Sequence, residues 1–176
     1  MRKNITEAWL KKEKACSGEV GWFLSQKETD EVRVIQALIS DGYLKWANWT
    51  LARRLPTQES RIKYAVYGPK QVLKNFEVEF PDDKSPRAAI NAAKAALKDP
   101  SKKNKEAAGS AADAAAKSAG CGCAADADAK SAGAAARAAA SAAFSATKYA
   151  AGSSESAMML KILNYGLQLL KPAKEV

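Results

Sequence analysis

The chain has 176 residues, 28 of them Lys or Arg and 19 Asp or Glu, which gives a formal net charge of +9 at pH 7. It contains no histidine, which excludes Ser-His-Asp and Cys-His nucleophiles, histidine-ligated zinc and an imidazole base. Its three cysteines, Cys16, Cys121 and Cys123, include no Cys-x-x-Cys pair and fit neither a disulfide framework nor a zinc site. We therefore expect a protein that is not an enzyme and that holds no metal or cofactor.

No apolar run approaches the roughly 20 residues that a membrane-spanning helix needs. Residues 1–4 lead into charged amphipathic sequence and not into the apolar core of a signal peptide. We expect a soluble cytoplasmic protein that does not bind membranes. The length suits a tryptophan-rich helical part at residues 1–56 and a helical bundle at residues 57–176, joined in one integrated domain.

In the first part, apolar residues at helical spacing predict a helix over residues 31–40, which Asp41-Gly42 ends. A second predicted helix covers residues 43–55 and carries Trp46 and Trp49 beside an apolar stripe.

Residues 58–80 have apolar positions three and four residues apart and predict a long amphipathic helix with Thr57 as its N-cap. Gly68-Pro69 lies in its middle, and proline removes a backbone hydrogen bond there. We expect a kink or two abutting helices. The next predicted helix has Ser85 as N-cap and Pro86 at its first position, and Asp99-Pro100 ends it.

Alanine, the strongest helix former, occupies more than half of residues 107–152. Residues 111–120 nearly repeat thirteen positions later as residues 124–133. In one straight helix this offset would rotate the second copy by roughly 220°, so we expect a break at residues 120–122 and a close-packed antiparallel hairpin. A last helix is predicted from Ser153 to Lys171. The expected fold is an all-α compact bundle of six to eight helices.

The positive charge is spread along the chain, with small clusters at residues 11–14, 53–63 and 102–105. These clusters are typical either of solvated helix faces or of a surface that contacts phosphates. Trp46 and Trp49, next to Arg53 and Arg54, could stack on bases. Beside an apolar stripe, they could equally be core residues or interface anchors.

Two further groups carry possible chemistry. Glu77, Glu79, Asp82 and Asp83 form the densest acidic group, but no glycine-centred calcium loop surrounds them, which favours a turn with capping aspartates. Cys121-Gly-Cys123 could bind a soft metal or sense redox state. Because no third ligand lies nearby in the sequence, small cysteines in a tight turn are the favoured interpretation.

Several short stretches together resemble an immunity protein family that occurs in bacteria and in phage genomes. These stretches are Ala15-Cys16 with Gly21-Trp22-Phe23, Trp46-Ala47-Asn48-Trp49 with Arg53-Arg54, Tyr64-Ala65-Val66-Tyr67, and Phe80-Pro81-Asp82-Asp83-Lys84-Ser85-Pro86-Arg87-Ala88-Ala89-Ile90. The family shares a tryptophan-rich start, a YPDD-x-RPR-x-AI-x-AA core and an alanine-rich helical tail, and the resemblance spans residues 15–152.

This sequence departs from the family pattern in three features. Ser85 replaces an arginine, Gly68-Pro69 interrupts a helix that is normally continuous, and the histidines of the tail are absent. The resemblance implies inhibition by binding and not a reaction. Within the motif, Asp82, Asp83 and Arg87 are interpreted as an internal ion-pair network that fixes the turn, with direct partner contact as the alternative.

We therefore expect a non-enzymatic inhibitor that binds and blocks one protein partner, which is a toxin or, for a phage gene, a host defence nuclease such as a CRISPR effector. Trp, Tyr and Arg dominate binding hot spots, and the basic charge favours an acidic partner surface. The candidate partner-binding residues are Trp46, Trp49, Arg53, Arg54, Arg61 and Lys63. The alternative is a basic protein that binds nucleic acid through phosphate contacts. A monomer and a homodimer both remain open.

Overall fold

The computed structural model describes residues 4–99, 101–104, 106 and 155–170. In these residues the regular structure is α-helical, apart from an isolated antiparallel bridge between Asn4 and Asp30. The helices are α1 (Glu7–Lys12), α2 (Ser17–Gln26), α3 (Glu31–Ser40), α4 (Leu44–Arg54), α5 (Gln58–Glu79), α6 (Ser85–Lys98) and α9 (Glu155–Leu170). The predicted all-α class is confirmed. The predicted alanine-rich hairpin at residues 107–152, with Cys121 and Cys123, lies outside the described residues.

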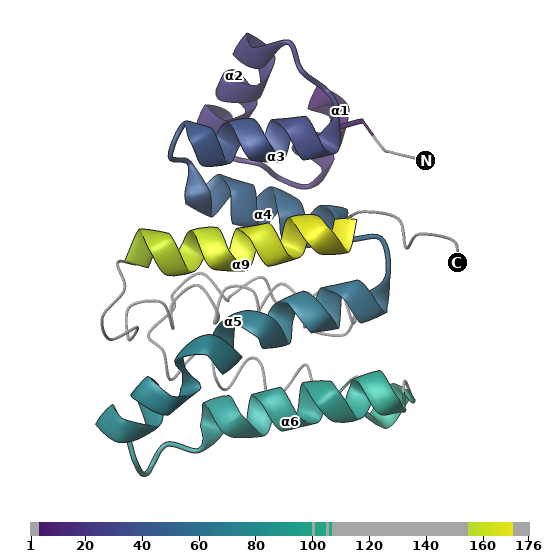
Figure 1. The fold of residues 1–176 in the computed structure, drawn as a ribbon. Helices are drawn as coiled ribbons and strands as arrows, with labels where there is room; N and C mark the ends of the chain where they lie inside the picture. Colours follow the sequence, from purple (N-terminus) through teal and green to yellow (C-terminus); the bar gives the residue numbers. More distant parts are fainter. Residues whose placement is uncertain (1–3, 100, 105, 107–154, 171–176) are drawn as a thin grey trace.

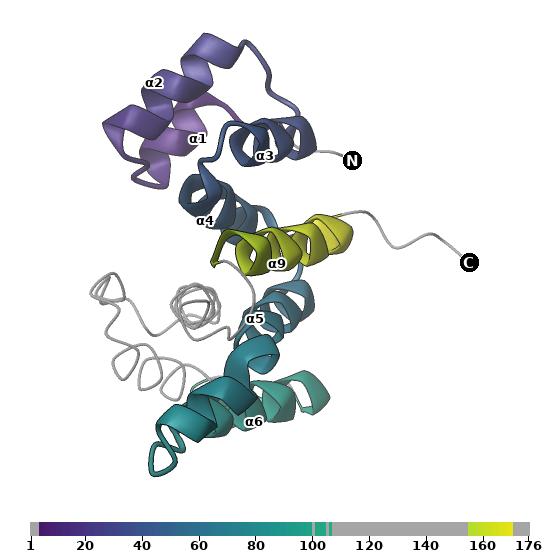
Figure 2. The same ribbon diagram turned by 60° about the vertical axis from the view of Figure 1, so that its left-hand side comes forward.

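α9 lies between α4 and α5, two helices that follow one another in the chain (Figures 1 and 2). α3 packs against α4, α6 packs against α5, and α1 and α2 pack against each other at the end of the stack farthest from α6. Within the described helices, none is both long and apolar enough to cross a lipid bilayer.

The main hydrophobic core forms where α9 meets α4 and α5. The residues Leu51 of α4, Leu55 directly after it, Tyr64 of α5, and Ile162 and Leu163 of α9 are almost completely buried in one cluster. Burial of each such side chain contributes about 1.5 to 3 kcal/mol to folding. The tryptophan-rich part and the later helices therefore share a hydrophobic core.

α9 packs closely against α4 and α5 because it has a glycine, Gly166, where it contacts them. A Cβ atom on Gly166 would lie 2.3 Å from Cδ2 of Leu51 and 2.5 Å from Cε2 of Tyr64. Both distances are far shorter than a carbon–carbon contact allows. Gly166 thus sets the spacing of α9 from both neighbouring helices.

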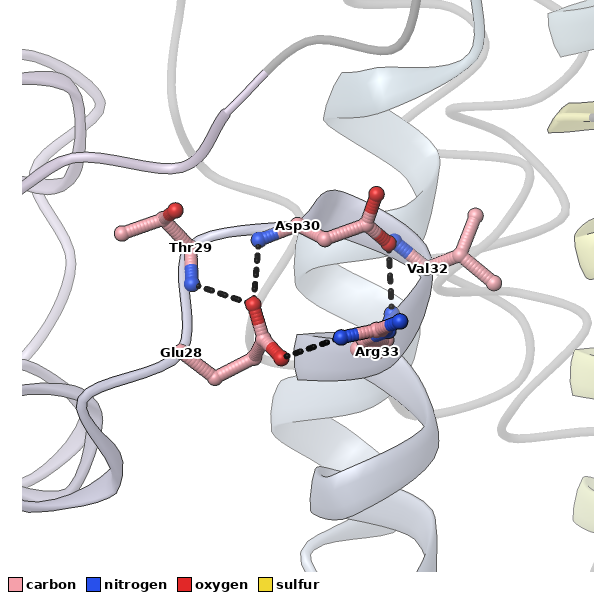
Figure 3. A network of polar contacts seen from close by, with 5 residues as sticks. All are labelled: Glu28, Thr29, Asp30, Val32 and Arg33. Carbon is pink, nitrogen blue, oxygen red and sulfur yellow. Dashed lines mark hydrogen bonds and ion pairs between the residues drawn. The ribbon is translucent and has the colours of Figure 1, made fainter.

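Side chains that precede α3 fix its first turn (Figure 3). Oδ1 of Asp30 accepts hydrogen bonds from the backbone N–H groups of Val32 and Arg33, each at 3.1 Å. Oε1 of Glu28 accepts from the N–H groups of Asp30 and Thr29, and the Arg33 guanidinium lies 3.5 Å from Oε2. These contacts lower the pKa of Glu28, the bonds from Asp30 and Thr29 being the main cause. The two bonds to Asp30 satisfy N–H groups that a helix N-terminus leaves unpaired.

The turn from α3 to α4 confirms that Asp41-Gly42 ends the first predicted helix. Gly42 adopts a left-handed φ of 81°, which glycine tolerates best. The Gly42 N–H donates to the Ile39 carbonyl and the Tyr43 N–H donates to the Leu38 carbonyl, which is the Schellman arrangement. This turn places Tyr43 directly before α4.

α5 begins with the predicted cap. Oγ1 of Thr57 accepts from the Ser60 N–H at 3.0 Å, and Oγ of Ser60 accepts from the Thr57 N–H at 3.1 Å, so each side chain caps the other backbone. α5 runs as one helix, and Figure 1 shows that its second half departs from the direction of its first. Of the two outcomes expected from Gly68-Pro69, the single bent helix is the one observed.

α6 begins one residue before the predicted position. Its N-cap is Lys84, which makes no side-chain capping bond, while Ser85 and Pro86 occupy the first helical positions. The prediction that Ser85 is the N-cap is therefore wrong. Proline is still accommodated, because an N–H group in the first turn has no partner within the helix.

Candidate protein-binding surface

Two polar groups on α4 form buried hydrogen bonds to other helices. The Tyr64 hydroxyl of α5 donates to Oδ1 of Asn48 at 2.6 Å, and the Thr50 hydroxyl donates to Oε1 of Glu19 on α2 at 3.0 Å. Burial raises the pKa of Tyr64, so its hydroxyl remains a donor. Glu19 is only 4% exposed, and desolvation raises its pKa to about 7, against the opposing effects of the Thr50 bond and the Arg53 charge.

Arg54, at the end of α4, forms an ion pair with Glu31 of α3. Nε of Arg54 lies 2.8 Å from Oε2 of Glu31, and the two side chains are only 8% and 9% exposed. The guanidinium also lies over the Trp9 ring and donates to the Asn4 carbonyl. The geometry thus gives Arg54, one of the predicted partner-binding residues, a structural position inside the molecule.

Arg53 has a different environment. Its Nε lies 3.3 Å from Oε2 of Glu13, directly after α1, and its guanidinium carbon lies 4.1 Å from the centre of the Trp49 ring. A cation over an aromatic face is attracted by about 0.5 to 2 kcal/mol. The pair fixes both the Trp49 ring and the Arg53 side chain in one orientation.

Five aromatic side chains within the first 49 residues make ring contacts with one another. Tyr43 stacks on Trp46 with centroids 4.5 Å apart, and Trp22 of α2 meets Tyr43 edge to face at 6.1 Å. Trp9 of α1 meets Trp49 edge to face at 5.9 Å. Trp46 and Trp49 are three residues apart in α4 and so lie on one side of the helix. We call Trp9, Trp22, Tyr43, Trp46, Trp49 and Arg53 together the aromatic strip.

The aromatic strip is only partly covered. Tyr43 is 42% exposed, while all four tryptophans are half-buried and pack against the main core. The sequence left open whether Trp46 and Trp49 are core residues or interface residues. Both side chains pack against the core and are also partly exposed to solvent.

The other two predicted binding residues, Arg61 and Lys63, lie on α5 and have local partners. Nε of Arg61 donates to the carbonyl of Leu55 at 3.0 Å, just after α4. Nζ of Lys63 pairs with Glu59 one turn earlier, and this hydrogen bond raises the pKa of Lys63. Neither residue belongs to the aromatic strip.

An ion pair between α5 and α6 spans the turn that joins these two helices. Arg87 donates two parallel hydrogen bonds to Glu77, from Nε to Oε1 and from one terminal nitrogen to Oε2, and this pair lowers the pKa of Glu77. The Asp83 N–H donates to the Phe80 carbonyl at 3.2 Å, and Lys84 donates to the carbonyl of Pro81. Glu77 is thus an ion-pair partner of Arg87 that the sequence-based interpretation of Asp82, Asp83 and Arg87 did not include.

Sequence reasoning identified Trp46, Trp49 and Arg53 but missed the other members of the aromatic strip. The available signal was that all four tryptophans of the chain lie within its first 49 residues. Residues 4–99, 101–104, 106 and 155–170 contain no cluster of three Cys, Asp or Glu side chains suited to a metal ion. Comparison with family models, with curated protein sequences and with solved structures finds no match for this chain.

Proposed function

We propose that this protein is a non-enzymatic inhibitor that binds and blocks a protein partner through the aromatic strip. The observation that carries the proposal is the chain of ring contacts from Trp22 through Tyr43 to Trp46, with Tyr43 42% exposed. Aromatic and arginine side chains are the residue types that contribute most to protein–protein binding energy.

The fixed orientation of these side chains supports the proposal. Trp22 donates from Nε1 to Oδ2 of Asp41 at 2.9 Å, and Trp49 is fixed by Trp9 and by Arg53. Side chains that are ordered before binding lose little conformational entropy in the complex. The aromatic strip would therefore bind more tightly than the same side chains on a mobile segment.

The partner class follows from charge and from the resemblance to immunity proteins. A net charge of +9 favours a partner with an acidic surface and accelerates encounter at low salt. We propose a cytoplasmic toxin as the partner or, if the gene is carried by a phage, a host defence nuclease such as a CRISPR effector.

Nucleic acid binding has weaker support. Many basic side chains of the described residues already have acidic partners, among them Lys11 with Glu7, Arg33 with Glu28, Lys63 with Glu59 and Arg87 with Glu77. Each such pair reduces the charge that phosphates would meet. Binding through phosphates would also weaken steeply as salt is raised.

Affinity capture from host lysate tests the proposal, with nuclease treatment and at low and physiological salt. The parent chain is compared with Tyr43→Ala and with Leu24→Ala. Leu24 is the matched control because it is 52% exposed and lies outside the aromatic strip. We expect the parent chain to capture one protein, and this capture should survive nuclease treatment and physiological salt. Tyr43→Ala should recover at least about tenfold less of that protein. Leu24→Ala should capture as well as the parent chain. Circular dichroism checks that both variants fold.

Equal capture by Tyr43→Ala and the parent chain would contradict the assignment to the aromatic strip. Recovery that disappears with nuclease or at physiological salt would favour the nucleic acid alternative.

A further inference from the structure

The aromatic strip is assembled from two parts of the chain. Trp9 and Trp22 belong to α1 and α2, which pack together and which we call the N-terminal hairpin. Tyr43 directly precedes α4, and Trp46 and Trp49 lie within α4. The ring contacts Trp22–Tyr43 and Trp9–Trp49 both cross between these parts. The strip is therefore intact only while the N-terminal hairpin is docked on α4.

Glu19 lies in the middle of this contact. It is in the first turn of α2, its side chain is 4% exposed, and its carboxyl accepts from Thr50, which is itself 1% exposed on α4. One residue before it, Gly18 lies against the Trp46 ring, where an added Cβ atom would be at 3.4 Å. The contact thus encloses a carboxyl group and excludes water from it.

The groups that favour an ionised Glu19 carboxylate have a smaller effect than the desolvation that opposes it. From α4, the Thr50 hydroxyl donates a neutral hydrogen bond and the Arg53 charge also favours the ionised form. From the end of α1, Glu13 pairs with Arg53 and offsets its charge. From the start of α2, the Cys16 thiol accepts the backbone N–H of Glu19. A buried carboxyl with these neighbours is most stable when protonated.

We propose that protonated Glu19 keeps the N-terminal hairpin docked on α4 and that its ionisation releases the hairpin and divides the aromatic strip. An ionised carboxylate gains hydration by leaving the contact, and Trp9 and Trp22 leave with it. The consequence for binding rests on the proposed function: the partner binds more weakly as the pH rises above neutrality.

Hydrogen exchange of the whole chain tests the release without any partner. Rates are corrected for intrinsic chemical exchange and followed from about pH 5.5 to about pH 8.5. Because each unit between pH and pKa changes the protonated fraction about tenfold, we expect exchange in residues 7–26 to rise at least about tenfold relative to α9. In Glu19→Gln, which keeps the shape without the charge, this rise should be absent.

A rise of the same size in Glu19→Gln, or no rise in the parent chain, would overturn the proposal. If Glu19→Gln does not fold, carboxyl carbon NMR of the parent chain replaces it. One glutamate that titrates near neutrality together with the exchange of residues 7–26 supports the proposal, and glutamates that all titrate in the acidic range overturn it. Because these measurements need no partner, they distinguish failure of hairpin release from failure of the proposed function.

Discussion

Arg54 on α4 and Glu31 on α3 are joined at 2.8 Å although they lie 23 positions apart in the chain, and both side chains are almost closed to solvent. A buried ion pair of this kind fixes how two helices pack, because either charge alone would be poorly solvated there. The pair explains why an arginine in a predicted binding cluster serves the fold.

The first prediction concerns this ion pair. Arg54→Met should lower the free energy of unfolding by about 3 to 5 kcal/mol, because it leaves the Glu31 carboxylate buried without its cation. Urea denaturation measures the change. The matched control is Arg33→Met, whose ion pair with Glu28 is exposed and should contribute less than about 1 kcal/mol. Equal losses in the two variants would show that burial of the Arg54 pair has no special effect.

The second prediction concerns Gly166. Gly166→Ala should destabilise the protein by about 1 to 3 kcal/mol, because the added methyl group meets Leu51 and Tyr64. Gly21→Ala is the control: no atom lies within 4 Å of its added Cβ, and alanine in a helix is favoured by up to about 1 kcal/mol. Thermal unfolding should therefore shift in opposite directions. A Gly166→Ala protein as stable as the parent would contradict the close approach of α9.

The third prediction concerns stability at rising pH. The folded pKa of Glu19 is raised from 4.5 to about 7, so its favourable contribution is complete below about pH 4.5 and is lost as the pH rises through about 7. The free energy of unfolding should fall by about 3 kcal/mol across this range. Denaturation of Glu19→Gln over the same range should lack this loss. Parallel curves for the two proteins would contradict the burial of a protonated Glu19.

The fourth prediction concerns acid. The folded pKa of Glu28 is lowered by the N–H groups of Asp30 and Thr29, so its stabilising contribution exists above the unfolded pKa and is lost as the pH falls through the folded one. Glu28→Gln should therefore be less stable than the parent at pH 7, and the difference should shrink in acid. Chemical denaturation at both pH values measures this difference. A constant difference would mean that the charge of Glu28 does not act on α3.

The features that the sequence predicted correctly are local ones. Helical spacing with Asp41-Gly42 defined α3, and Thr57 marked the start of α5, because caps and turns depend on neighbouring residues. The position of α9 between α4 and α5 was not predictable, since it depends on contacts between segments about one hundred residues apart in the sequence. The role of Gly166 follows from that position and was missed with it.

The same distinction applies to the aromatic strip. Trp46, Trp49 and Arg53 share one side of α4 by helical spacing alone, so the sequence indicated them. Trp9 and Trp22 contact them only because the N-terminal hairpin packs on α4. Arg54 is buried because it forms an ion pair with Glu31. Neither effect has a signal in the spacing of residues.

Hydrogen exchange of the complex with the captured partner tests the central claim most directly. If the aromatic strip is the binding surface, the partner should slow exchange in residues 17–26 and 43–54, and exchange in α6 should stay unchanged. Protection confined to α5 and α6, with residues 43–54 exchanging as in the free protein, would contradict the account.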